Sequence, residues 1–164
     1  MEKADKSITQ ARKERLTQYI YIKGEYEDYE EELTRLENNA CIPATKESDG
    51  SKKNPGASDR MANAAVKYME YKAEVEPDMA RIKAEMDTIK AAISGLRDGL
   101  ERQVLRLRYI IGDTDENGED VRDQMPWRKV SQRMFKSDDD AKLQIVYRIH
   151  GRALQNIDLE GLED

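Results

Sequence analysis

Basic and amide side chains recur in the last third of the chain, in a pattern that suits contact with nucleic acid. They are Arg128, Lys129, Arg133, Lys142, Gln144, Arg148 and Arg152. Arginine, lysine and glutamine are the residue types that hold phosphates or hydrogen-bond to base edges. Solvated charges on an ordinary helix surface look the same in a sequence, and small three-helix modules also dock onto proteins. Both interpretations stay open on these residues alone.

The residues that usually carry catalysis or bind metals are sparse. His150 is the only histidine and Cys41 the only cysteine, so the usual ligand sets for zinc are lacking. No glycine-rich phosphate loop is present. Residues 113–124 alternate acids and have a glycine in the sixth place, but Gln124 stands where an EF-hand calcium loop needs a glutamate. We therefore expect a protein that is not an enzyme and has no metal or cofactor.

Three short helices are predicted to position the basic and amide side chains. The first has an apolar stripe at intervals of four, three and four residues, formed by Leu100, Val104, Leu107 and Ile111. Gly112 is expected to end this helix in a left-handed conformation. An acidic loop follows over residues 113–123, with a turn predicted at Asn117-Gly118.

The second and third helices are predicted over residues 126–154. Pro126 stands where a helix can begin, and the buried positions after it are Trp127, Val130 and Met134. Ser137 and Asp140 form a capping-box pattern for the third helix. Its expected buried side consists of Leu143, Val146 or Tyr147, Gly151 or Ala153, and Leu154. Two short helices joined by a turn can place the second one, here around residues 142–152, in a DNA major groove. Arg128, Lys129 and Arg133 would then hold phosphates.

Three segments of this region resemble the region-four domain of sigma factors. The segment Leu100-Glu-Arg-Gln-Val-Leu-Arg-Leu-Arg-Tyr109 resembles its opening helix. The segments Trp127-Arg-Lys-Val-Ser-Gln-Arg-Met134 and Tyr147-Arg-Ile-His-Gly-Arg-Ala-Leu154 resemble its helix-turn-helix. The combination with a helical N-terminal region is similar to the ArpU and RinA family of late-transcription regulators from phages and prophages. The resemblance implies binding to double-stranded DNA, control of phage genes and a possible contact with RNA polymerase.

Two features depart from the family pattern. The acidic loop before Pro126 is longer than the tight link expected there, and the segment 138–144 is lengthened by about one helical turn. Acids at the front of a recognition helix would repel phosphates. They favour an alternative function, a non-enzymatic coiled-coil interaction factor that binds RNA polymerase or serves phage assembly or packaging, with a helix-turn-helix that no longer reads DNA.

The first 95 residues are predicted to form a long antiparallel helical hairpin of the coiled-coil kind, followed by the helix-turn-helix domain over residues 96–164. The first seam consists of Tyr19, Ile22, Tyr26, Tyr29, Leu33 and Leu36. A flexible loop is expected over about residues 39–57. The second seam consists of Met61, Ala65, Tyr68, Lys72, Val75, Met79, Ile82, Met86, Ile89, Ile93 and Leu96. Pro77 predicts a break or kink near Val75–Pro77. Surplus apolar surface on the second helix suits a homodimer.

Composition and charge bound the class of protein. The chain has 164 residues and a formal net charge of -6, which argues against non-specific binding of nucleic acid by the whole chain but leaves room for a local basic face. No secretory segment and no apolar run of about 20 residues is visible, so no membrane partner is expected. A single cysteine cannot form an internal disulfide, which favours a cytoplasmic location.

Overall fold

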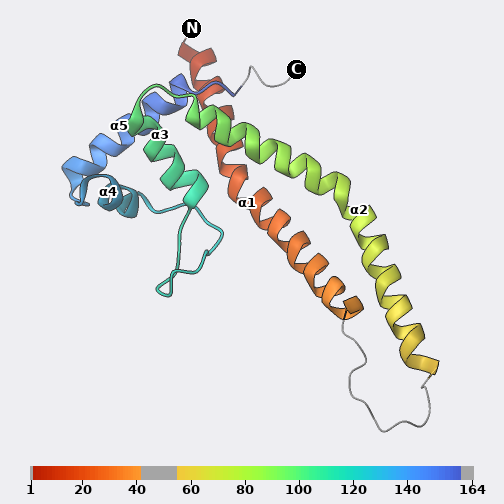
Figure 1. Cartoon of the computed structure of the whole chain (residues 1–164). Coiled ribbons are helices and arrows are strands. Elements are labelled where there is room, and N and C mark those ends of the chain that lie inside the picture. The colour runs from red at the N-terminus through yellow and green to blue at the C-terminus, as the bar shows by residue number, and fades with distance from the viewer. Residues whose placement is uncertain (1, 42–54, 160–164) are drawn as a thin grey trace. The chain divides into compact units, whose positions relative to one another are not determined.

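The computed structural model describes residues 2–41 and 55–159, and this part of the chain is all-α as expected. Its helices are α1 (Glu2–Cys41), α2 (Pro55–Ser94), α3 (Gly99–Leu105), the π-helix η1 (Arg106–Ile111), α4 (Trp127–Phe135) and α5 (Asp140–Asn156) (Figure 1). The described residues form no named strand; a single isolated β-bridge pairs Thr114 with Asp120.

The long helices α1 and α2 pack together as a helical hairpin, which confirms the expected hairpin. The expected loop is shorter at both ends, because residues 39–41 belong to α1 and residues 55–57 to α2. The rest of that prediction, residues 42–54, lies outside the described residues. The expected break near Pro77 is wrong, because α2 runs through Pro77 without interruption. The other form of that prediction, a kink near Val75–Pro77, stays a prediction. Val75 and Ile82, on either side of Pro77, are buried.

The chain divides into two compact units. Unit 1 comprises Met1–Gly24 and Ala84–Asp164, and unit 2 comprises Glu25–Lys83. This division runs through α1 and α2 and differs from the sequence-based boundary near residue 95, which stays a prediction.

Unit 2 contains the second part of α1 and the larger part of α2, and few of its described residues are buried. Of its described residues only Val75 and Ile82 are buried, while Tyr26, Tyr29, Leu33 and Leu36 are half-buried along the expected first seam. The second seam differs from the prediction in two ways. Met61 and Ala65 are exposed at its beginning, and further along Tyr71 is half-buried and Lys72 is exposed. On the inner side of α2 the structure therefore has the aromatic Tyr71 in place of Lys72, which the sequence pattern predicts there.

Unit 1 contains one hydrophobic core to which every helix contributes. Members from α1 and α2 are Leu16, Tyr19, Ile20, Ile89 and Ile93; members from the C-terminal helices are Val104, Leu105, Leu107, Tyr109, Val130, Val146, Ile149, Ala153 and Leu154. The beginning of α1 is therefore part of the C-terminal domain and does more than form the hairpin.

The π-helix changes the apolar stripe predicted for the first short helix. Val104 and Leu107 are buried as expected, but Leu100 is 41% exposed and Ile111 is 46% exposed. The amide of Gly112 donates to the carbonyl of Leu107, five residues back, and this wider turn shifts the inward face. Tyr109 is buried in consequence, and Leu105 is buried at the end of α3.

Candidate nucleic-acid interface

A helix-turn-helix is formed by α4, the residues 136–139 and α5 (Figure 1). Lys136 ends α4 in a left-handed conformation, with φ 58 and ψ 24. The Ser131 hydroxyl donates to the carbonyl of Ser137 across the turn, at 2.6 Å. The predicted cap is wrong in its residue: the carboxylate of Asp139, and not the hydroxyl of Ser137, accepts from the backbone amide of Lys142. Ser137 instead donates to Asp139, at 2.9 Å.

The outer side of α5 carries three of the predicted site residues. Gln144, Arg148 and Arg152 follow each other at intervals of four, and all three are exposed. The opposite side of the helix is buried and consists of Leu143, Val146, Ile149, His150, Ala153 and Leu154. The structure decides the two alternatives left open for the buried side of this helix. Val146 is buried, whereas Tyr147 is 42% exposed; Ala153 is buried, whereas Gly151 is half-buried. We call Gln144, Ile145, Arg148, Arg152 and Gln155 the α5 face.

The two arginines of the α5 face are not engaged elsewhere in the described structure. Among residues 2–41 and 55–159, the guanidinium group of neither Arg148 nor Arg152 forms a hydrogen bond or an ion pair. Both line a shallow hollow together with Ile145, Ile149, Gly151 and Gln155. Their guanidinium groups are therefore open to an anionic partner.

The other predicted residues are not gathered with them. Arg128 donates to the carbonyl of Asp138, at 3.2 Å. The ammonium of Lys129 pairs with the carboxylate of Asp113 and donates to the carbonyl of Thr114. Lys142 is half-buried, with its ammonium 5.5 Å from the centre of the Phe135 ring. Arg133 is exposed on α4.

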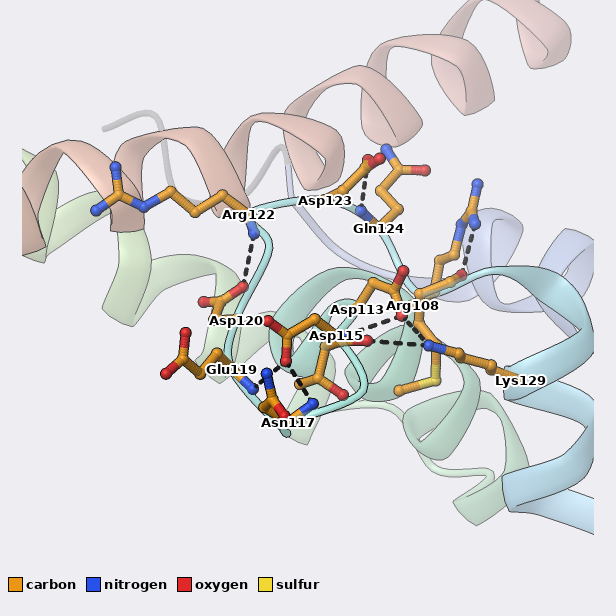
Figure 2. Close-up of polar contacts among 12 residues, drawn as sticks. Arg108, Asp113, Asp115, Asn117, Glu119, Asp120, Arg122, Asp123, Gln124 and Lys129 are labelled. Atoms are coloured by element: carbon orange, nitrogen blue, oxygen red, sulfur yellow. Dashed lines mark hydrogen bonds and ion pairs between the residues drawn. The ribbon is translucent and has the colours of Figure 1, made fainter.

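The acidic loop between η1 and α4 is held by its own backbone (Figure 2). The amide of Asp113 donates to the carbonyl of Asp123, and the amide of Asp115 to that of Glu119, both at 2.8 Å. One carboxylate oxygen of Asp115 accepts from two backbone amides, those of Asn117 and Glu119. Gly118 has φ 81, which confirms the predicted turn.

These carboxylates do not converge on a metal. They accept backbone amides of the loop, and the ammonium of Lys129 occupies the Asp113 carboxylate (Figure 2). Within the described ranges, no group of three or more histidine, cysteine, aspartate or glutamate side chains is arranged to hold a metal ion.

A buried polar and aromatic cluster lies behind the α5 face. The hydroxyl of Tyr109 lies 2.7 Å from Nε2 of His150. The Trp127 ring meets the His150 ring edge-on, at 4.7 Å between centres. Arg108 lies over Trp127, with Cζ 4.4 Å from the ring centre, and donates to the carbonyl of Met125 at 2.6 Å. His150 thus packs the helix-turn-helix against η1.

Sequence reasoning missed two arginines that position α5. Arg12 of α1 donates to the carbonyls of Leu154 and Gln155, at 2.9 and 2.8 Å, where α5 ends. A cation there complements the negative end of the helix dipole. Arg15 donates to the carbonyl of Leu159 at 2.6 Å and pairs with Glu85 at 2.7 Å. A difference in charge along the first helix could have indicated this role. Residues 1–24 contain six Lys or Arg and three Asp or Glu, whereas residues 25–41 contain one Arg and seven Asp or Glu.

The net negative charge belongs mainly to the unit that lacks α5. By sequence, unit 1 contains 19 Lys or Arg and 20 Asp or Glu, whereas unit 2 contains 9 Lys or Arg and 14 Asp or Glu. The unit that carries the α5 face is therefore close to neutral.

Comparison with protein-family models, curated proteins and solved structures gives no match to this chain. No helix in the described part of the chain is both long and apolar enough to cross a membrane.

Proposed function

We propose that this protein binds double-stranded DNA by inserting α5 into the major groove, and that it acts as a transcriptional regulator of phage or prophage genes. The observation that carries the proposal is the α5 face, on which Gln144, Arg148 and Arg152 are aligned and exposed on the second helix of a helix-turn-helix. The regulatory role rests on the resemblance of the C-terminal segments to sigma region four.

The dimensions of the α5 face suit a short run of base pairs. Gln144 and Arg152 are eight residues apart, which is about 12 Å along a helix. Base pairs are stacked about 3.4 Å apart, so the face spans roughly three to four of them. Arginine bonds best to guanine edges and glutamine to adenine edges. Two arginines and one glutamine therefore favour a half-site that contains both guanine and adenine.

The acidic side chains near α5 differ in how strongly they would oppose the entry of α5 into the major groove. Asp139 is taken up by the helix cap, and Asp113 by Lys129. Asp138 and Asp140 are exposed at the start of α5. They would repel phosphate, so we expect Asp138→Asn with Asp140→Asn to strengthen binding several-fold. Unchanged affinity in an electrophoretic shift assay would mean that these two carboxylates face away from the DNA.

The central test is a charge reversal on the α5 face. Arg148→Glu with Arg152→Glu should weaken binding to a preferred genomic fragment by about 100-fold or more, since each good base contact contributes about 1–3 kcal/mol. Fluorescence anisotropy over a range of salt concentrations measures the affinity, and circular dichroism checks that helicity is kept.

A matched control uses exposed cations of unit 2. Arg60→Glu with Lys67→Glu makes the same change in net charge on α2. Its affinity should stay near that of the unaltered protein. Equal losses in both double variants would mean that only net charge matters, and no loss in either would remove α5 as the recognition helix.

A second function is favoured by apolar groups close to the α5 face. Ile145 is 37% exposed and Tyr147 is 42% exposed, and exposed apolar side chains beside arginines also suit a protein partner. In that case the unaltered protein would not bind DNA even at low salt. RNA polymerase would then be the partner to test, with Ile145→Asp as the variant expected to lose it.

A further inference from the structure

We infer that the first half of α1 forms a second wall of the DNA interface, where Lys6 and Lys13 contact phosphates beside the groove that α5 enters. The inference rests on the proposed function and extends the site to a helix that the sequence pattern assigns to the hairpin alone. All residues concerned belong to unit 1.

The α5 face continues onto α1 without interruption. The hollow that contains Arg148 and Arg152 also contains Gly151 and Gln155. A second hollow contains the same Gly151 and Gln155, together with residues of α1, namely Asp5, Lys6, Thr9, Gln10 and Lys13. The two hollows therefore share a border on α5, and the lysines of α1 lie across it from the arginines.

The position of α1 beside α5 is fixed by several contacts. Arg12 donates to the two carbonyls at the end of α5, and Leu16 is fully buried in the shared core. Lys6 and Lys13 are seven residues apart, close to two helical turns, and so share the side of α1 that meets this border. Because this part of α1 is already a packed helix, its backbone need not be ordered when the lysines contact an anion.

Both lysines are available to an anion. Lys6 and Lys13 are exposed, and within the described residues the ammonium group of neither forms a hydrogen bond or an ion pair. The positive charge of Lys13 also acts on the buried ring of His150 and, after burial, helps to lower its pKa. Asp5 is the one acid that lines this hollow, so cations outnumber anions around the border.

Gly151 lies at the border and leaves space there. A Cβ added to Gly151 would have no other atom within 4 Å. A larger side chain can therefore be introduced without a clash, and replacing glycine inside a helix also favours the helical state. A charged side chain introduced at position 151 would therefore lie between the arginines of the α5 face and the lysines of α1.

The first experiment measures the salt dependence of DNA binding. Each phosphate contact contributes about 0.9 to the slope of log affinity against log salt concentration. Lys6→Gln with Lys13→Gln should lower that slope by about 2 and should weaken binding to preferred and unrelated sequences by similar factors. The control Arg60→Gln with Lys67→Gln removes the same charge from α2 and should leave the slope unchanged.

The second experiment uses the border itself. Gly151→Glu should weaken binding at least about 10-fold, since a negative charge placed at the interface repels phosphate. Gly151→Gln, of the same size and without the charge, should have little effect. Equal effects of Gln and Glu would indicate obstruction and overturn the electrostatic role of the border.

The outcomes separate this inference from the proposed function. If Arg148→Glu with Arg152→Glu abolishes binding while the lysine variant keeps the full slope, α1 is not part of the interface and the proposed function stands. If the unaltered protein does not bind DNA at low salt, both are overturned.

Discussion

His150 is a buried ionisable side chain whose pKa differs between the folded and the unfolded chain. Its ring is buried against Tyr109 and Trp127. Burial, followed by the charges of Lys13 and Arg108, lowers its pKa from the ordinary 6.5 to about 4. Burial also raises the pKa of Tyr109 to about 12, so the pair stays neutral at pH 7.

This shift links stability to pH with a definite sign. Between pH 6.5 and 4 the unfolded chain binds a proton at His150 and the folded chain does not, so the free energy of unfolding falls as pH falls through this window. Between pH 7 and pH 5 the loss should be about 2 kcal/mol. Chemical denaturation at the two pH values measures it, and because the chain has one histidine, its NMR titration gives the folded pKa directly.

The matched variant is His150→Gln, which keeps a polar group beside Tyr109 and cannot titrate. Its free energy of unfolding should change less between pH 7 and pH 5, by about the 2 kcal/mol assigned to His150. An equally steep pH dependence in the variant would show that other groups are responsible.

At the scale of the element, Gly112 ends η1 in a conformation that other residues rarely adopt. Its φ is 71 and its ψ is -167. A Cβ at this place would lie 2.7 Å from the carbonyl oxygen of Asp123, which is backbone and cannot move aside cheaply. The glycine therefore allows the acidic loop to close directly onto the end of the π-helix.

Gly112→Ala should destabilise unit 1 by about 2 kcal/mol or more, from backbone strain and the contact with Asp123 together. Gly118→Ala is the control, since Gly118 has φ 81 but no atom within 4 Å of an added Cβ. Thermal unfolding of both variants should show the larger loss for Gly112. Equal losses would mean that the Asp123 contact relaxes without cost.

The sequence predicts these elements better than it predicts which side of each faces inward. Periodic apolar residues placed all the helices, and Pro126 and Gly112 marked boundaries correctly. The predicted inward face of the first short helix was wrong at Leu100 and Ile111. At Ile111 the reason is the π-helix, which a regular 3.6-residue period does not foresee. At Leu100 the reason is the orientation of α3, which buries Glu101 in its place. The cap moved from Ser137 to Asp139 because both residue types suit that role and only the turn geometry decides.

The candidate site was predictable on α5 and not beyond it. Intervals of four residues are enough to align Gln144, Arg148 and Arg152 on one helix. The carbonyl contacts of Arg12 join residues more than 140 positions apart, and local patterns carry no information on such a contact. The pairing of Lys129 with Asp113 likewise depends on how the acidic loop folds back.

At the scale of the whole molecule, the two units should differ in stability. Unit 1 has a core of large buried side chains from all of its helices, whereas only Val75 and Ile82 are buried among the described residues of unit 2. Local opening costs least where few apolar groups are buried. Unit 2 also exposes a second apolar row on α2, which consists of Ala62, Val66, Met69 and Ala73.

Hydrogen exchange followed by mass spectrometry should therefore show weaker protection for residues 25–40 and 60–80 than for α3 and α5. The difference should amount to at least a tenfold change in protection factor, because a helical hairpin without a further layer retains little stability of its own. If unit 2 is instead protected as strongly as α5, and this protection rises with protein concentration, a second copy must cover the row around Val66 and Met69. Val66→Glu with Met69→Glu would then remove the concentration dependence, and the DNA-binding form would be the homodimer that two symmetric half-sites require.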